Sequence, residues 1–314
     1  MKVLVIQQRY GIGDMVIFSP YIQAISHKLK TPVTLLAKKS SRAKDLFAYD
    51  ECIEEIINLD KTLDKFSGFL KLAKVIDEKK FDKIFIFNGS LRYRVLSNYI
   101  GINSIYQYPL FTSRDVIFQT AKIFTENIFG DIISSEPKLK INNDDIEKMI
   151  EKYSLSKTNK NIILGISASG PSKRWGISNF IQLAKKLKSV YKCKFYLAGG
   201  EEDKSIINEF ISSDLKECSF SLANLDIKEI MPIIKSSDLY VGNDTGFMHI
   251  SAGLGLNCVG IFFDSPAYSY SGYTKNIEAV IPEGQTLHST THNTRGRDKI
   301  SFNEVFEKVK KNIN

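Results

Sequence analysis

The chain has 314 residues, of which 43% are hydrophobic and 25% are charged, and this balance excludes an intrinsically disordered protein. The length suits two domains of ordinary size, each with its own core. The apolar runs, such as Ile84–Phe87 and Val259–Phe263, are of strand length, so no membrane span is predicted. The N-terminus has no signal-peptide pattern, and the four cysteines are scattered without CxxC pairing. These features predict a cytoplasmic protein with reduced thiols.

The net charge is +8, and the first 140 residues hold 21 Lys/Arg against 15 Asp/Glu, while the remainder holds 22 against 20. An excess of positive charge in the first half suits an anionic acceptor or an anionic membrane surface. A composition rich in lysine throughout explains it equally well. No basic block with interleaved aromatic residues indicates nucleic-acid binding.

Apolar periodicity and turn residues predict alternating strands and helices along the first half. The predicted elements are a strand at 2–6, a helix after residue 14 that kinks or restarts near Pro20, strands at 33–37, 53–59 and 81–87, and helices at 41–48, 63–78 and 91–100. Residues 111–155 are predicted to be mostly helical, and the polar stretch 154–161 is predicted to be a linker.

The second half repeats this alternation. It has predicted strands at 162–166, 193–198, 239–241 and 258–263, helices at 177–190, 201–211, 226–235 and 302–312, and a loop-rich stretch up to residue 297. We therefore expect two Rossmann-like, doubly wound parallel sheets, one in residues 1–155 and one in residues 156–314. Such a pair leaves a ligand cleft between the carboxyl ends of the sheets.

Four loops at predicted strand ends carry candidate chemistry. In the first, Gly11 and Gly13 let the backbone approach a ligand, but the third glycine of the dinucleotide fingerprint is absent. Asp14 is either a helix cap or a carboxylate that acts as a general base.

The second loop, residues 167–175, carries small hydroxyl residues and two cations. Lys173 and Arg174 either neutralise a phosphate or form a solvated pair beside Trp175, which is expected to anchor the loop by packing.

The third loop, Asp244-Thr245-Gly246, stands at the predicted mouth of a helix. Unpaired N–H groups and the helix dipole could hold an anion there, or the polar residues could be ordinary caps. His249 follows Thr245 on the same helix face.

In the fourth loop, which follows the predicted strand at 193–198, Glu201 and Glu202 either bind a ribose or satisfy a helix dipole. The histidines and cysteines lack the spacing of a zinc site, and no pair of carboxylates flanks one residue at a strand end, so the sequence does not predict a metal ion.

Four stretches together resemble the ADP-heptose:lipopolysaccharide heptosyltransferases, the family 9 glycosyltransferases of GT-B fold. Gly11–Pro20 is similar to the family's "GD, apolar run, P" signature, and Phe87–Arg92 is similar to its "QGSLRS" loop. Ser169–Trp175 looks like its "K-x-W" donor loop, and Ser237–Ala252 looks like its "NDTGPMHLAAA" signature. The matches are in order over about residues 1–265. Phe247 and the residues from Asp264 onward depart from the family pattern.

The resemblance implies an inverting, metal-independent transfer of a sugar from a nucleotide diphosphate. Asp14 would take the proton from the acceptor hydroxyl, and Lys173 would stabilise the leaving diphosphate. The other implied donor-binding residues are Ser169, Arg174, Glu201, Glu202, Leu225, Asp244, Thr245, Gly246 and His249. The implied acceptor-side residues are Gly11, Gly13, Ser90 and Arg92.

On this resemblance we expect a heptosyltransferase of lipopolysaccharide or lipooligosaccharide core synthesis, with an acceptor domain first and a donor domain second, and a final helix that could pack back on the first. It needs no cofactor or metal. Its substrates would be ADP-heptose and an anionic glycolipid of the lipid A–Kdo type, so a cytoplasmic protein at the inner face of the cytoplasmic membrane is expected. The alternatives are a glycosyltransferase with another donor or a protein acceptor, a sugar-nucleotide epimerase, and a binding module.

Overall fold

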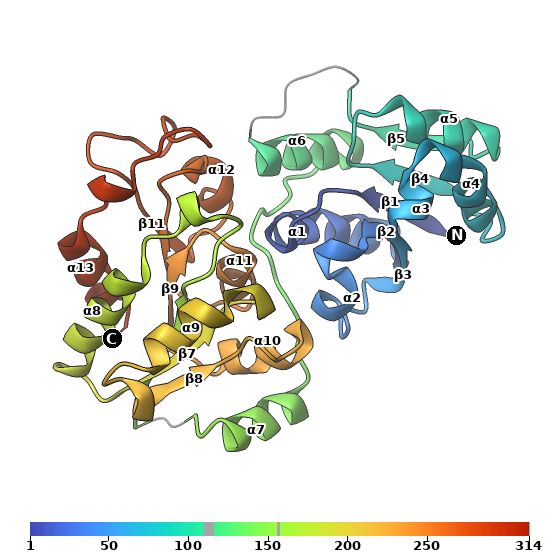
Figure 1. The fold of residues 1–314 in the computed structure, drawn as a ribbon. Coiled ribbons are helices and arrows are strands. Elements are labelled where there is room, and N and C mark those ends of the chain that lie inside the picture. The colour runs from blue at the N-terminus through green and yellow to red at the C-terminus, as the bar shows by residue number, and fades with distance from the viewer. Residues whose placement is uncertain (110–115, 156–157, 314) are drawn as a thin grey trace. The chain divides into compact units, whose positions relative to one another are not determined.

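The computed structural model describes the chain except for residues 110–115, 156–157 and 314. The chain forms two compact units, Met1–Pro137 and Lys138–Asn314, coloured blue to green and green to red in Figure 1. The division falls earlier than the boundary predicted after residue 155. The reason is a helix, α7 (Asn143–Lys152), which packs against α10 (Ile227–Lys235) of the second unit.

The first unit is built on a five-stranded parallel sheet in the order β3-β2-β1-β4-β5. All five residues of the central strand are fully buried, as expected for a strand covered on both faces. The strands are β1 (Val3–Gln7), β2 (Val33–Lys38), β3 (Ile53–Leu59), β4 (Lys83–Ile86) and β5 (Ser104–Gln107). The α-helices are α1 (Ile12–Leu29), α2 (Ala43–Leu46), α3 (Lys61–Asp64), α4 (Phe69–Asp77), α5 (Leu91–Tyr99) and α6 (Ile117–Phe129).

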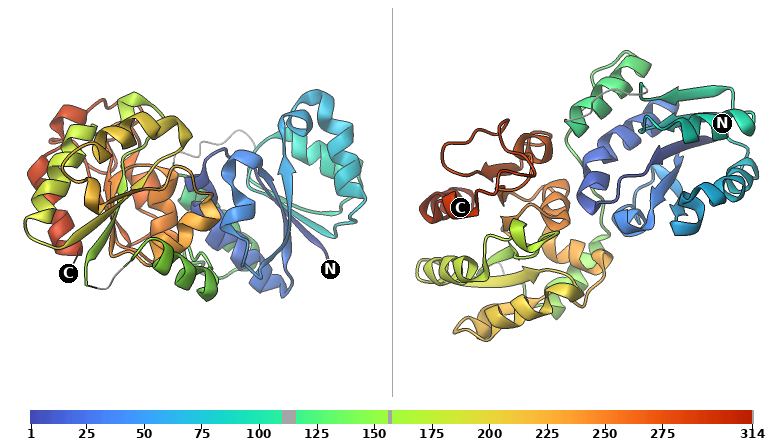
Figure 2. Two further views of the ribbon diagram at one scale, coloured as in Figure 1. Left: turned by 60° about the horizontal axis from the view of Figure 1, so that its bottom comes forward. Right: turned by 45° about the horizontal axis from the view of Figure 1, so that its top comes forward.

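The second unit is built on a six-stranded parallel sheet in the order β11-β10-β9-β6-β7-β8. Its strands are β6 (Lys160–Gly165), β7 (Cys193–Ala198), β8 (Ser219–Ser221), β9 (Leu239–Asn243), β10 (Cys258–Ile261) and β11 (Ile277–Val280). Its further α-helices are α8 (Ile177–Lys188), α9 (Lys204–Ile211), α11 (Gly246–Gly253), α12 (Ala267–Ser271) and α13 (Phe302–Asn312). Figure 2 shows these helices around the sheet from two further directions. The final helix, α13, packs against β10 and α8 of its own unit.

The expected fold class is therefore confirmed, since two parallel sheets with flanking helices are present. Both sheets reverse strand order beside their first strand, β1 or β6, which is the doubly wound topology. Three short strands, β5, β8 and β11, were not predicted. These strands are only three or four residues long, which is too short to show a hydrophobic period.

Of the two alternatives predicted near Pro20, the helix restart is wrong, because α1 runs unbroken from Ile12 to Leu29, and the kink stays a prediction. Proline lacks the N–H that would bond the carbonyl of Val16 four residues earlier. The Ser19 hydroxyl donates to that carbonyl instead, at 2.7 Å, and so satisfies it inside the buried face of the helix. The predicted helix over 63–78 is divided into α3, a 3-10 turn η2 (Phe66–Gly68) and α4.

Candidate functional site

A buried tyrosine, Tyr240 of β9, contacts the turn that follows this strand. Gly165 of β6 and Gly242 of β9 are paired in register, and a side chain on Gly165 would meet the Tyr240 hydroxyl at 1.8 Å. Because Gly165 has no side chain, Tyr240 fits beside the two strands. Its hydroxyl donates to the carbonyl of Asn243 at 2.9 Å and lies 3.3 Å from the Thr245 hydroxyl. Burial raises the pKa of Tyr240, so the hydroxyl keeps its proton for these contacts.

The last residue of β9, Asn243, connects this turn to the loop after β6. Its fully buried amide nitrogen donates to the carbonyls of Ile166 and Ser167, each at 3.1 Å. Its amide oxygen accepts from the backbone N–H of Trp175 at 3.0 Å. One side chain therefore holds both ends of the 166–175 loop against the start of α11. The sequence placed Asn243 in a motif, but it could not show which way the side chain points.

The capping alternative for Thr245 is not realised. Thr245 is the N-cap residue of α11, but its side chain makes no hydrogen bond to the helix amides, and its hydroxyl lies beside Tyr240 instead. Gly246 opens the helix and adds no side chain that would cover those amides. Among the described residues, the N-terminus of α11 is therefore left without a side-chain acceptor, as an anion site requires.

His249 lies behind this turn in a polar cluster. Its Nδ1 atom is 2.8 Å from the Tyr273 hydroxyl, and its Nε2 atom is 3.3 Å from a carboxylate oxygen of Asp244. The imidazole is nearly inaccessible, while Asp244 keeps 15% of its side chain exposed. His249 thus orients Asp244, and Asp244 is the member of the pair that a ligand can reach.

The 166–175 loop presents Ser169 to solvent, and a 3-10 turn η3 (Pro171–Lys173) follows it. The Ser172 hydroxyl donates to Asp264 at 3.3 Å, which ties the turn to the segment after β10. Lys173 is partly exposed, and within the described parts of the chain its ammonium group has no ion pair. Lys173 is therefore available to an anionic ligand.

Arg174 is placed differently from the prediction that it neutralises a phosphate. Its guanidinium forms an ion pair with Asp203 at 2.7 Å, and only 1% of the Asp203 side chain is exposed. Asp203 also accepts from the backbone N–H of Gly200 at 3.0 Å. Arg174 thus balances the charge of a buried carboxylate in the 3-10 turn η4 (Glu201–Asp203). The sequence could not indicate this partner, because the two residues lie in separate loops.

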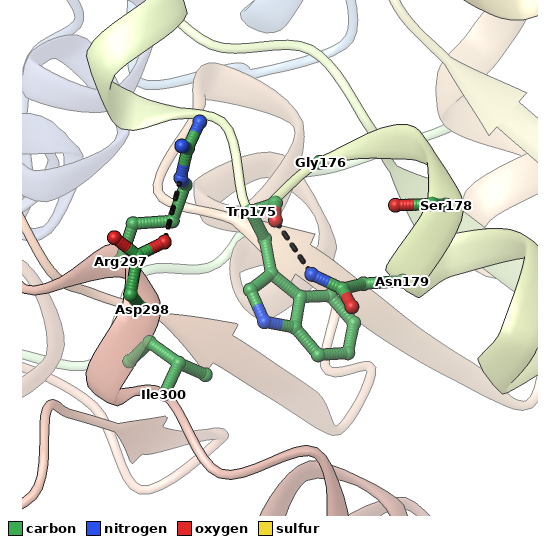
Figure 3. A pocket seen from close by; sticks show the side chains of 7 residues that line it. All are labelled: Trp175, Gly176, Ser178, Asn179, Arg297, Asp298 and Ile300. Carbon is green, nitrogen blue, oxygen red and sulfur yellow. Dashed lines mark hydrogen bonds and ion pairs between the residues drawn. The ribbon is translucent and has the colours of Figure 1, made fainter.

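Trp175 anchors the loop, as predicted. It is 2% exposed, its ring meets Phe180 edge-on at 5.2 Å, and it stacks with Phe302 of α13 at 6.0 Å. Figure 3 shows Trp175 in a pocket between the start of α8 and the 3-10 turn η6 (Arg297–Lys299), with the Asn179 amide donating to its carbonyl. The tryptophan thus serves packing, while the opposite end of the loop carries the exposed Ser169.

Glu201 and Glu202 follow the carboxyl end of β7. Glu201 is exposed and pairs with Lys204, whereas the Glu202 carboxylate folds over Gly200, within 2.6 Å of where a Cβ would lie. Leu225 is half-buried between β8 and α10. These contacts leave Glu202 the better placed of the two carboxylates for hydroxyl groups at this edge.

At the carboxyl edge of the first sheet, Asp14 occupies the third position of α1. Its carboxylate accepts from the Gly11 backbone N–H at 3.3 Å and from the Arg9 guanidinium at 2.8 Å. Gly11 is the N-cap residue and Gly13 lies inside the helix. Asp14 therefore makes one half of a capping box, since Gly11 has no side chain to make the other, and 14% of the Asp14 side chain is still exposed. Both alternatives for Asp14, cap and accessible carboxylate, coexist at this position.

Ser90 and Arg92 have structural contacts in the same unit. Ser90 is the N-cap of α5 and accepts from the Arg92 N–H at 3.2 Å. The Arg92 guanidinium donates to the carbonyls of Leu63, Asp64 and Lys65 at the end of α3. Arg92 therefore closes the end of α3, and its acceptor-side role stays a prediction.

The described residues contain neither a cluster of metal-ligating side chains nor a membrane-spanning helix. In the described residues, no three side chains of His, Cys, Asp or Glu are grouped closely enough to hold a metal ion. Outside the gaps in the description, none of the helices is long and apolar enough to span a membrane.

Comparison with known proteins identifies the family. The family model described as "Glycosyltransferase family 9 (heptosyltransferase)" matches residues 105–297. Lipopolysaccharide heptosyltransferase 1 of Campylobacter coli is 26% identical over 205 residues, which cover 63% of this chain and 54% of that protein. The chain thus spans about half the length of this relative.

Two solved structures share the fold. A glycosyl transferase family 9 protein from Veillonella parvula has a TM-score of 0.83 at 16% identity, covering 99% of this chain and 97% of its own. The E. coli ADP-heptose LPS heptosyltransferase II has a TM-score of 0.74 at 18% identity, covering 99% and 100%. With more than half of its residues matched by the family model, the chain belongs to glycosyltransferase family 9.

Proposed function

We propose that this protein transfers a heptose from ADP-heptose to the inner core of a lipopolysaccharide or lipooligosaccharide, with inversion at the anomeric carbon and without a metal ion. The single observation that carries the proposal is the pairing of two features: the N-terminus of α11, which the Thr245 side chain does not cap, and the Lys173 ammonium group on the neighbouring loop, which has no ion pair within the described residues. Family membership and the related Campylobacter coli protein support the class of substrate.

In the proposed donor site, the diphosphate lies on the amides of Thr245 and Gly246 and against Lys173. Displacement at the anomeric carbon builds negative charge on the leaving diphosphate, and preoriented amides with one cation stabilise it. These groups would supply the positive charge that a metal ion supplies in other transferases. Asp244, oriented by His249, would accept hydrogen bonds from hydroxyls of the donor sugar.

Ser169, Glu202 and Leu225 complete the proposed donor site. The exposed Ser169 hydroxyl would donate to a phosphate oxygen, the Glu202 carboxylate would accept from the ribose hydroxyls, and Leu225 would contact the adenine. Arg174 acts indirectly in this account, because its pairing with Asp203 fixes the turn that carries Glu202.

In the proposed chemical step, Asp14 removes the proton from the acceptor hydroxyl as its oxygen attacks the anomeric carbon. The new glycosidic bond forms while the bond from that carbon to the diphosphate oxygen breaks, and ADP leaves. One carboxylate base suffices, since direct displacement inverts the centre without a covalent intermediate. Gly11 and Gly13 would let the acceptor approach the start of α1, and Ser90 would border it.

A nucleotide panel tests the donor assignment. Binding to the native state raises the unfolding temperature in proportion to the affinity. ADP and ADP-heptose should therefore raise it, while UDP and GDP at the same concentration should leave it unchanged. Stabilisation by UDP or GDP without stabilisation by ADP would contradict the ADP-heptose assignment.

A further inference from the structure

The first unit exposes large apolar side chains on neighbouring helices. Phe66 of η2 is 94% exposed, and Leu70 of α4 is 65% exposed. Leu91, Val95 and Tyr99 of α5 are 52%, 54% and 65% exposed. We refer to these five residues as the apolar patch. Exposed apolar residues that are scattered singly are ordinary, but a contiguous group marks an interaction surface.

The apolar patch is continuous because α5 lies against the segment that carries Phe66 and Leu70. Leu91, Val95 and Tyr99 are each four residues apart, so they form one stripe along the helix. At the start of the stripe, Arg92 donates to the carbonyl of Lys65 at 3.1 Å. At its end, the Tyr99 ring meets Phe69 at 6.1 Å. Figures 1 and 2 show α4 and α5 side by side in the first unit.

Positive charge surrounds the apolar patch. Residues 65–76 contain three lysines and no acidic residue, and residues 88–100 contain two arginines and no acidic residue. Lys65, Lys71, Lys74 and Arg94 are all exposed. Within the described residues, Lys65 and Arg94 form no ion pair. Lys74 lies 4.0 Å from Glu78, which follows the end of α4. An apolar surface bordered by exposed cations complements a bilayer whose surface carries anionic headgroups.

The position of the patch in the unit fits a substrate that is anchored in a membrane. Helix α3 follows the carboxyl end of β3, and α5 follows the carboxyl end of β4. The carboxyl ends of parallel strands share one edge of the sheet, so the start of the patch and the Asp14 turn after β1 belong to the same edge. A headgroup held at this edge could remain attached to lipid beside it.

We propose that the apolar patch and its basic rim dock the first unit on an anionic lipid bilayer, with Phe66, Leu70 and the α5 stripe inserted at the interface. The inference rests on exposure, contacts and charge, and does not depend on the identity of the transferred sugar. A second copy of this chain is a competing occupant of the same surface, and the experiment below separates the two.

The test is co-sedimentation of the full-length protein with vesicles of phosphatidylcholine alone or of phosphatidylcholine with one-third phosphatidylglycerol. We expect binding to the anionic vesicles that weakens as salt is raised, because salt screens the surface charges. The double variant Phe66→Ser/Leu70→Gln should lower the partition coefficient by at least about tenfold. Lys65→Gln/Arg94→Gln should lower it by a similar factor on anionic vesicles alone.

Matched controls use exposed residues outside the patch. Ile123→Ser/Ile132→Ser removes two exposed isoleucines, which are 56% and 91% exposed, and Lys148→Gln/Lys192→Gln removes two exposed lysines of the second unit. Both controls should bind vesicles as the unchanged protein does. Urea unfolding midpoints check that every variant is folded.

Three results would overturn the proposal. The first is absence of binding to anionic vesicles, and the second is equal loss of binding in the patch and control variants. The third is a dimer in light scattering that the Phe66→Ser/Leu70→Gln change dissociates, without any vesicle binding. The vesicles contain neither donor nor acceptor, so none of these results bears on the transfer reaction itself.

Discussion

At the scale of single residues, the two adjacent cations of the 166–175 loop have different surroundings. Lys173 has no ion pair in the described residues, whereas Arg174 balances the buried carboxylate of Asp203. The sequence predicted one role for both, because adjacent residues in a loop give no indication of which one faces the interior. Only the contact with a distant loop distinguishes them.

This difference predicts opposite effects of two similar substitutions. Lys173→Met should leave the unfolding free energy nearly unchanged but weaken ADP binding by roughly 10- to 100-fold, because it removes a charge-assisted hydrogen bond of about 1.5–3 kcal/mol. Arg174→Met should lower the unfolding free energy by about 3–5 kcal/mol, because it leaves Asp203 buried without its partner. Urea unfolding and isothermal titration with ADP measure the two effects.

Equal loss of stability in both variants would mean that Lys173 has a structural partner. Undiminished ADP binding in Lys173→Met would remove this residue from the donor site. Lys192→Met, at an exposed lysine of the same unit, is the matched control, and it should change neither quantity.

Residue identity predicted the candidates better than it predicted their contacts. Asp14, Asp244, Thr245, Gly246 and Lys173 all lie at the carboxyl edge of their own sheet, as the motifs indicated. The sequence could not show that Arg92 closes the end of α3 or that Asn243 supports the donor loop. Those roles depend on side-chain directions and on pairs of residues far apart in the chain.

At the scale of elements, the strand β9, its turn and α11 form the support of the proposed donor site. The support depends on a close approach of β6 and β9, since a Cβ on Gly242 would lie 2.4 Å from the Cα of Gly165. Tyr240 occupies the space beside these glycines and contacts the turn above. The geometry of the turn is therefore determined by packing within the sheet.

Gly165→Ala should accordingly be strongly destabilising. The new Cβ would overlap the Tyr240 hydroxyl at 1.8 Å and the ring carbon next to it at 2.4 Å, and overpacking in a dense core costs about 1–3 kcal/mol or more. Urea unfolding of the full chain measures this cost. Gly170→Ala is the matched control, since a Cβ there meets nothing within 4 Å.

A Gly165→Ala variant as stable as the Gly170→Ala control would show that Tyr240 moves aside without cost. In that case the tyrosine would not support the turn. Because Tyr240 supports the turn of the proposed donor site, Gly165→Ala should also weaken ADP binding: a displaced Tyr240 releases its contact with Asn243.

The longer elements were predictable and the short ones were not. Strands with three or more buried apolar residues, such as β1 and β6, carry a pattern that only a covered parallel sheet explains. The edge strands β8 and β11 have mixed burial and few residues. Their pairing is set by the sheet that they join, and therefore by residues elsewhere in the chain.

At the scale of the whole molecule, the chain consists of two doubly wound units with related topology and different candidate roles. The GT-B fold class was predictable because strand–helix alternation runs through both halves of the sequence. The division between the units was not, because the polar stretch predicted as the linker follows α7, and the sequence does not show that α7 packs against α10 of the second unit.

We propose that this chain uses Asp14 as the base that deprotonates the acceptor when heptose is transferred from ADP-heptose. The most direct measurement is mass spectrometry of a Kdo–lipid A acceptor after incubation with ADP-heptose and EDTA. We expect one added heptose with the unchanged protein, and a rate about 10²- to 10⁴-fold lower with Asp14→Asn, which should still bind ADP. No transfer by the unchanged protein, or an undiminished rate in Asp14→Asn, would contradict it.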